Sequence, residues 1–189
     1  MEQQDTAAQL TARMASRDVA TSALLIALLV VSCLFTIPLG PVPFTLQTAV
    51  VILVALLCTP RQATLVIGVY LLMGAVGLPV FSSMTGGLGK LLGPTGGFLF
   101  GFFASAPIAA MLRAGITRRT NRSILGDIAA AACIIVVSDA LGLAWFMFVT
   151  QSDAANALLM TTLPFIVPDV CKAALAIIVA AAVRKGLRL

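Results

Sequence analysis

Charged side chains are absent from long stretches of this chain. Residues 19–60 contain none, which is enough for two membrane-spanning helices of about 20 residues each. The stretch Pro38-Leu-Gly-Pro-Val-Pro43 divides them, because its prolines and glycine cannot continue a helix. The pattern therefore predicts a first span over about Ala20–Ile37 and a second over about Thr45–Thr59.

The remaining apolar segments predict four further spans. Residues 81–97 are rich in glycine but also hold apolar side chains, so we expect a long loop that folds back over the bundle. A short polar stretch, residues 150–156, precedes an apolar lead-in to the last span. The predicted third to sixth spans are about Gln62–Val80, Phe98–Leu112, Ile124–Val149 and Pro168–Val183.

The composition supports an all-helical integral membrane protein. Hydrophobic residues make up 60% of the chain and charged residues only 10%, against roughly 25% in a soluble domain. We expect a single transmembrane domain over residues 1–189, with a polar N-terminus (1–18), a six-helix bundle (19–183) and a basic tail (184–189). Nucleic-acid binding is a poor explanation of the net charge of +5, because the basic residues lie in short loops and tails. The chain has no histidine, and nothing in it indicates a metal or cofactor site.

The basic residues also predict an orientation. With six spans, ten Lys and Arg fall in the termini and loops of one side, and only Lys90 falls in the loops of the other. Positive charge favours the cytoplasmic side, so both termini should be cytoplasmic. The Pro-rich turn, the Gly-rich loop and the start of the sixth span then share the outer side.

An acid and a base, Asp169 and Lys172, stand inside the apolar sequence of the sixth span. A charge at bilayer depth costs roughly 3 kcal/mol and usually faces a cavity or a partner. Residues three apart on a helix project from the same face, and Pro168 suits the first turn of that helix. The pair is either a ligand-binding acceptor and donor or a structural ion pair that steadies the bundle.

Two other outer features supply candidate ligand contacts. The Pro-rich turn leads to Thr45 and Gln47, and the Gly-rich loop carries polar, cationic and glycine residues: Ser82, Lys90, Gly96 and Gly97. Glycine lets backbone approach a ligand closely, although these glycines can equally serve turns and helix crossings. Together the features suit a small molecule with an anionic end and an amide-like end.

Two features within the spans have open interpretations. Asp139, in the fifth span, is a proton relay, a partner for Lys172 or a neutral hydrogen-bonded acid, and a structural role is favoured. Ala23 and Ala27 form a small-x-x-x-small pair on the first span. Such a pair either packs within the protein or forms a docking face for a partner membrane subunit.

Four motifs resemble those of the BioY family of biotin transporters, the substrate-binding S components of energy-coupling factor (ECF) transporters. They occur in the family's order and spacing and cover most of the chain. The final motif usually has Gly before the Asp, where this chain has Pro168. The four motifs are Gly40-Pro-Val-Pro-Phe-Thr-Leu-Gln47, Gly77-Leu-Pro-Val-Phe81, Leu92-Gly-Pro-Thr-Gly-Gly97 and Pro164-Phe-Ile-Val-Pro-Asp-Val-Cys-Lys172.

The resemblance implies a six-helix S-component fold in the bacterial cell membrane, with a biotin pocket near the outer face. It carries the acid and the lysine of the last motif onto Asp169 and Lys172 as ligand contacts. It places Ala23 and Ala27 against a transmembrane coupling subunit that recruits two cytoplasmic ATPases. Biotin would be a substrate and no cofactor would be needed. Some members of the family are thought to act without the ATPase module.

Two alternatives to such a subunit remain. One is a stand-alone carrier of biotin or a related small anion, oligomeric or coupled to an ion through Asp139. The other is an intramembrane enzyme with Asp139 and Asp169 as a catalytic pair, which the lack of histidine and of a serine–base arrangement disfavours.

The orientation is tested by cysteine labelling. A cysteine placed at position 187 should not react with an impermeant reagent added outside intact cells, because the C-terminal tail is expected in the cytoplasm. Ready labelling would overturn this topology.

Overall fold

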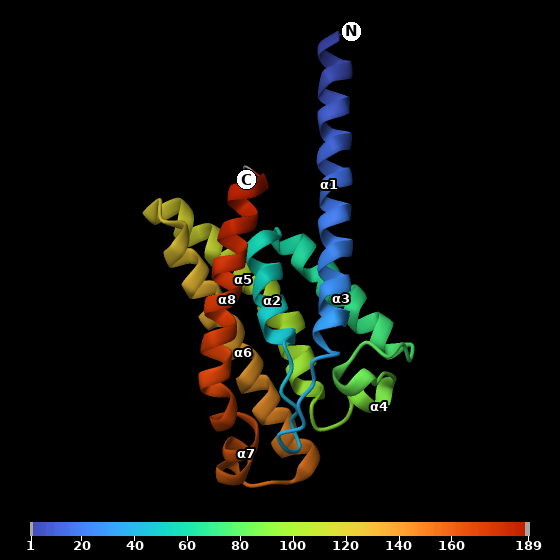
Figure 1. Ribbon diagram of the computed structural model, residues 1–189, viewed down its shortest axis with the longest axis vertical. Coiled ribbons are helices and arrows are strands. Elements are labelled where there is room, and N and C mark those ends of the chain that lie inside the picture. Colours follow the sequence, from blue (N-terminus) through green and yellow to red (C-terminus); the bar gives the residue numbers. More distant parts are fainter. Residues whose placement is uncertain (1, 188–189) are drawn as a thin grey trace.

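The computed structural model describes the backbone of residues 2–187 and the side-chain surroundings of residues 16–186. The described chain is helical, and its helices run alternately up and down between two ends of the molecule (Figure 1). In chain order the helices are α1 (Glu2–Ser32), α2 (Gln47–Leu57), α3 (Pro60–Ala75), η1 (Ser82–Met84), α4 (Leu88–Leu91), α5 (Gly96–Thr120), α6 (Ser123–Thr150), α7 (Ala154–Thr161), η2 (Leu163–Phe165) and α8 (Ile166–Leu187).

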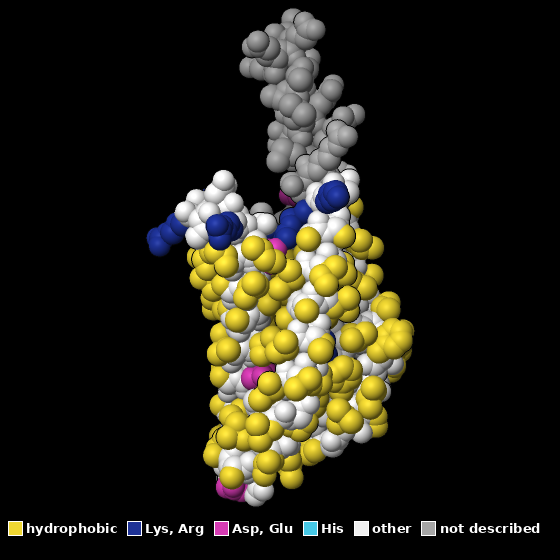
Figure 2. Space-filling model, turned by 60° about the vertical axis from the view of Figure 1, so that its left-hand side comes forward, with side chains coloured by type: hydrophobic (Ala, Val, Ile, Leu, Met, Phe, Trp, Pro, Cys, Tyr) yellow, Lys and Arg dark blue, Asp and Glu magenta, His cyan; other side chains and the backbone are white. Residues whose placement is uncertain are grey.

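The two ends of the bundle differ in character. At one end α1 begins and α8 ends, and Figure 2 shows the Lys and Arg side chains gathered there above a band of hydrophobic side chains. We call this the basic end. The opposite end holds α4, α7 and the connection between α1 and α2 (Figure 1), and we call it the pocket end.

Each of the six predicted spans overlaps a helix, although several boundaries differ. By length and composition, α5, α6 and the segment Ala154–Gly186 are long and apolar enough to cross a membrane. Helix α2 has 11 residues and is only about 16 Å long. The sequence predicted that α1 and α3 would end at Ile37 and Val80, but they end at Ser32 and Ala75. The chain can leave α3 there because Gly77 takes a positive φ of 100°.

Two stretches predicted to lack helix contain helical turns. The Gly-rich stretch 81–97 includes η1 and α4, and its last two glycines belong to α5. Residues 154–161, predicted as polar stretch and apolar lead-in, form α7. This helix begins because the Asp153 side chain accepts a hydrogen bond from the Asn156 backbone N–H at 3.2 Å.

Helix α2 lies at the centre of the core, and its side chains from Ala49 to Leu56 are all buried. This short helix is enclosed by α1, α3, α5, α6 and α8. Helix α3 follows after a tight turn, where Thr59 and Gln62 form a capping box and Pro60 occupies the first helical position. A separate small cluster of Val42, Phe146, Ala157 and Phe165 closes the pocket end.

Large apolar side chains also cover the outward faces of the long helices. Leu24, Leu65, Ile108, Val136 and Ile178 are all exposed. Figure 2 shows the resulting hydrophobic band on one side of the bundle. A surface this apolar is suited to lipid rather than water and is typical of a membrane protein.

Helices α5 and α6 form a closely packed antiparallel pair, and glycines make the close approach possible. A Cβ atom added to Gly97 would lie 2.7 Å from the Leu141 carbonyl oxygen and would overlap the Trp145 side chain, while one on Gly101 would lie 2.7 Å from the Ser138 Cα. Gly96 is likewise packed against the Leu91 carbonyl. The two glycines of the predicted ligand loop therefore form the start of α5, where Gly96 packs against α4 and Gly97 packs against α6.

Replacing Gly97 with Ala should destabilise the protein, because the added methyl group forces α5 and α6 apart. We expect a loss of about 1–3 kcal/mol, visible as a lower thermal unfolding midpoint of the detergent-solubilised protein. Gly89→Ala is the matched control, since a Cβ atom there meets no atom within 4 Å. Equal midpoints for the two variants would contradict the packing role of Gly97.

Candidate functional site

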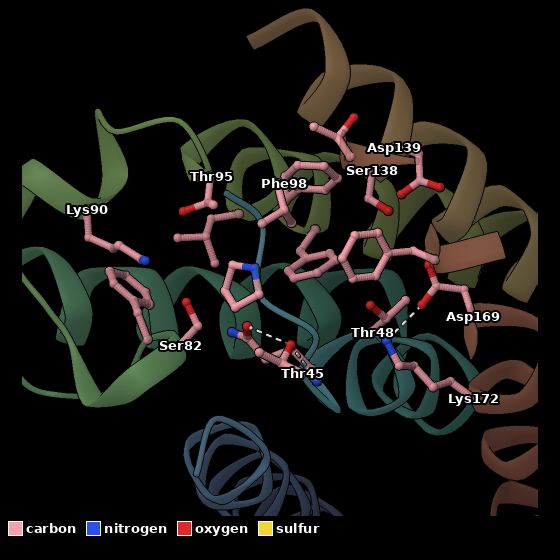
Figure 3. A pocket seen from close by; sticks show the side chains of 18 residues that line it. Thr45, Thr48, Ser82, Lys90, Thr95, Phe98, Ser138, Asp139, Asp169 and Lys172 are labelled. Atoms are coloured by element: carbon pink, nitrogen blue, oxygen red, sulfur yellow. Dashed lines mark hydrogen bonds and ion pairs between the residues drawn. The ribbon is translucent and has the colours of Figure 1, made fainter. Parts of the chain in front are cut away.

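A pocket opens among the helices at the pocket end. It encloses about 630 Å³ of space not occupied by atoms, open solvent at its mouth included. Figure 3 shows the side chains around it. They come from the α1–α2 connection, α2, the Gly-rich stretch, α5, α6, α7, η2 and α8: Val42, Pro43, Thr45, Gln47, Thr48, Phe81, Ser82, Lys90, Thr95, Phe98, Leu99, Phe102, Ser138, Asp139, Thr161, Phe165, Asp169 and Lys172.

Asp169 and Lys172 line one end of this pocket as a buried ion pair. The Lys172 Nζ atom lies 2.8 Å from the Asp169 Oδ1 atom, and each residue is only 5% exposed. The prediction that Asp169 and Lys172 project from the same face of one helix is therefore confirmed. The Lys172 ammonium also lies 4.1 Å from the centre of the Phe44 ring. The negative face of an aromatic ring attracts a cation, so this contact stabilises the ammonium. Among the described residues, Asp169 Oδ2 makes no hydrogen bond, so an acceptor remains for a ligand.

Asp139 contributes a second carboxylate to the same end of the pocket. It projects from α6 beside Ser138 and lies near Asp169 in Figure 3. Asp139 therefore lines the same pocket as the predicted site residues Asp169 and Lys172. Together with Asp169 and Lys172, it gives this end two acids and one base.

Gln47 and Thr45 lie on the pocket wall as part of a buried hydrogen-bond network. Thr45 donates to the Gln47 amide oxygen at 3.2 Å, and the Gln47 amide nitrogen donates to the Tyr70 hydroxyl. Tyr70 in turn donates to the Val80 carbonyl at 2.8 Å. The network joins the start of α2 to α3 and to the chain that follows α3. It holds the Gln47 amide in a fixed orientation at the pocket wall.

Lys90, Ser82 and Thr95 lie at the other end of the pocket in Figure 3. Lys90 belongs to α4 and is partly buried, and this burial lowers the pKa of its ammonium from the ordinary value. The Gly-rich stretch is held down by Trp145, whose indole N–H donates to the Gly93 carbonyl at 3.0 Å. The pocket thus has a cationic end at α4 and a mixed-charge end at α8.

Four phenylalanines form an aromatic wall of the pocket, which the sequence analysis missed. Phe98 and Phe102 stand one helical turn apart on α5, with Phe81 and Phe165 completing the wall. The i, i+4 spacing on α5 was a usable signal. Phe81 and Phe165 give no such signal, since both lie outside the long helices.

The remaining predicted site residues lie outside the pocket. Gly96 and Gly97 are buried in the contacts of α5 and are not among the lining residues. Ala23 and Ala27 are exposed on α1, whose inward face carries Leu25 and Leu29. The alanine pair is therefore free of the protein's own core.

Comparison with known proteins decides the family. The sequence profile described as the BioY family matches residues 3–189. The chain belongs to the BioY family. A probable biotin transporter BioY of Pyrococcus horikoshii is 36% identical over 88% of this chain and 96% of its own length. The biotin transporter BioY of Thermotoga maritima is 35% identical over 89% of this chain and 96% of its own length.

The fold agrees with this family. A crystal structure of the S-component for biotin from an ECF-type ABC transporter superimposes with a TM-score of 0.85 at 25% sequence identity. The match covers 92% of this chain and 93% of that chain. The helical arrangement predicted from the BioY resemblance is therefore that of an ECF S component.

Proposed function

We propose that this BioY-family chain binds biotin at the pocket end and mediates its uptake into the cell. The single observation that carries the proposal is the buried Asp169–Lys172 pair on the wall of a pocket whose other end holds Lys90. The similar proteins named as biotin transporters, and the biotin S component of the same fold, support this choice of ligand. We propose a binding and transport role without chemical turnover.

The chemistry of biotin matches the two ends of the pocket. Its ureido ring offers two N–H donors and one carbonyl acceptor, and Asp169 and Lys172 supply the complementary acceptor and donor. Its apolar thioether ring suits the aromatic wall of Phe98 and Phe102. In a dry pocket each charge-assisted hydrogen bond contributes roughly 1.5–3 kcal/mol. Few polar contacts can therefore give tight binding.

The carboxylate tail of biotin is assigned to the α4 end of the pocket. Lys90 offers a cation there, and Ser82 and Thr95 offer hydroxyl groups. Gln47 and Thr45 also line the pocket, with an amide and a hydroxyl. Gly96 and Gly97 act on binding only indirectly, by seating the start of α5.

We also propose that six helices, α1, α2, α3, α5, α6 and α8, cross the bacterial cell membrane with both termini in the cytoplasm. The apolar outward faces and the gathering of Lys and Arg at the basic end support this orientation. The short α2 is enclosed by other helices, so the protein rather than lipid covers its ends. The whole chain then acts as one transmembrane domain.

The partners proposed for uptake are an ECF transmembrane coupling subunit and two cytoplasmic ATPases. The structural relative belongs to an ECF-type ABC transporter, and Ala23 and Ala27 present a small-residue face on α1 that this chain leaves uncovered. Small residues allow close approach of another helix in a membrane.

A stand-alone, ion-coupled carrier is the second candidate, because Asp139 lies in the pocket. Asp139→Asn removes the charge and keeps the shape of the side chain. Coupling through Asp139 predicts that this variant loses concentrative uptake in cells. Uptake equal to that of the unaltered protein would eliminate Asp139 as the coupling residue and leave the ATP-driven scheme.

The ligand role of the ion pair is tested by Lys172→Met. Methionine keeps much of the side chain's bulk but removes its donors, so a ligand acceptor enters the site unpaired and Asp169 loses its counter-charge. We expect a loss of roughly 2–5 kcal/mol, or about 30- to several-thousand-fold in biotin affinity, measured by calorimetric titration of the folded protein.

The matched control is Arg61→Met, which removes an exposed cation outside the pocket. It should bind biotin like the unaltered protein. If Lys172→Met instead lowers thermal stability yet binds with unaltered affinity once folded, the pair is only structural.

The partner face is tested by the double variant Ala23→Trp and Ala27→Trp. Two indole rings on the exposed side of α1 should block a docked helix without reaching the pocket. We expect normal biotin binding by the purified protein and loss of ATP-driven uptake. Loss of binding in the purified variant would place the pair in the protein's own packing.

A further inference from the structure

A second buried charge cluster lies toward the basic end, apart from the ligand pocket. Asp127 of α6 is 1% exposed and is held by two arginines. The Arg113 Nε atom of α5 lies 2.6 Å from Asp127 Oδ1, and Arg184 of α8 contacts both carboxylate oxygens. Arg184 also donates to the Leu56 carbonyl at 3.3 Å, at the end of α2. One carboxylate therefore faces two guanidinium groups.

A cavity opens directly beside this cluster. It encloses about 1,010 Å³, open solvent included, and its polar lining is Arg113, Arg184, Lys185 and Ser123. Leu56, Leu57 and Ala181 form its apolar lining. The three cations and the single carboxylate of Asp127 leave a net charge of +2 at this cavity.

Several donors of the cavity make no hydrogen bond to the residues whose side chains the structure describes. Among the described residues, no hydrogen bond involves the two terminal nitrogens of Arg113 or the Lys185 ammonium. Asp127 already accepts hydrogen bonds on both oxygens, from Arg113 and from Arg184. The cavity thus offers a guanidinium fork, an ammonium and a hydroxyl to an oxygen-rich anion.

The surroundings favour an anion that carries hydrocarbon. Ile178 lies one helical turn before Ala181 on the same side of α8 and is 66% exposed, so an apolar path leads away from the cations. Figure 2 shows Lys and Arg side chains at the border between the hydrophobic band and the basic end. Basic pockets between helices at the cytoplasmic side of a membrane bind phospholipid headgroups.

We propose that this cavity binds the phosphate headgroup of an anionic phospholipid, with Arg113 and Lys185 as its principal donors and an acyl chain along Ile178. The bound lipid would connect α5, α6 and α8 where they leave the membrane. The site is separate from the ligand pocket and does not depend on the identity of the transported molecule.

Native mass spectrometry of the full-length protein in detergent tests the proposal. The probes are phosphatidylglycerol and phosphatidylcholine with identical acyl chains. We expect phosphatidylglycerol to bind at least tenfold more tightly, and Lys185→Gln to weaken its binding about fivefold, since one interfacial cation contributes about that factor. Arg61→Gln removes an exposed cation in the first turn of α3 and should leave binding unchanged.

A second variant separates the site from a general charge effect. Arg113→Lys keeps a cation beside Asp127 but removes the free guanidinium fork, so it should reduce the preference for phosphatidylglycerol while the thermal unfolding midpoint stays close to that of the unaltered protein. Equal binding of the two lipids, or an equal loss in Arg61→Gln and Lys185→Gln, would overturn the proposal. Displacement of phosphatidylglycerol by equimolar inorganic phosphate would also overturn it, because the site would then recognise a free anion without its lipid.

Discussion

A charge enclosed in an apolar medium must find its partner inside the protein, and this constraint organises both ends of the bundle. Asp169 and Lys172 satisfy this constraint by forming an ion pair with each other on one face of α8. Asp127 meets it with arginines from two other helices. The two arrangements have different consequences, because an ion pair within one helix does not link that helix to its neighbours. A cluster shared by three helices ties them together.

Backbone groups face the same constraint where helices stop short. Helix α2 begins only at Gln47, and α3 ends at Ala75, so the chain at the pocket end runs partly without helical hydrogen bonds. Tyr70 satisfies part of this need by donating to the Val80 carbonyl while accepting from Gln47. These interruptions border the pocket, and Gln47, which donates to the Tyr70 hydroxyl, lines it.

Much of this arrangement is encoded in local sequence patterns. The i, i+3 spacing placed Asp169 and Lys172 together, and the prolines and glycines between apolar runs located most helix boundaries within a few residues. The sequence left the roles of Gly96 and Gly97 open, because a glycine that admits a ligand and one that admits another helix look alike there. Phe165 and Asp127 could not be placed either, since Phe165 clusters with Val42 and Asp127 pairs with Arg184, both of which are far away in the chain.

The carboxylates of the two charge clusters differ in how many of their oxygens are paired within the protein, and this difference separates a structural contact from a binding site. Both oxygens of Asp127 are engaged by arginines, so any movement of α5, α6 or α8 at the basic end would expose a buried carboxylate without its partners, a loss of about 3–5 kcal/mol. Asp169 uses one oxygen for Lys172 and keeps the other toward the pocket. A ligand that supplies a donor and an acceptor can therefore join this pair without leaving either charge alone. The helices are linked at Asp127, where both carboxylate oxygens are paired, and a ligand can bind at Asp169, where one oxygen is not.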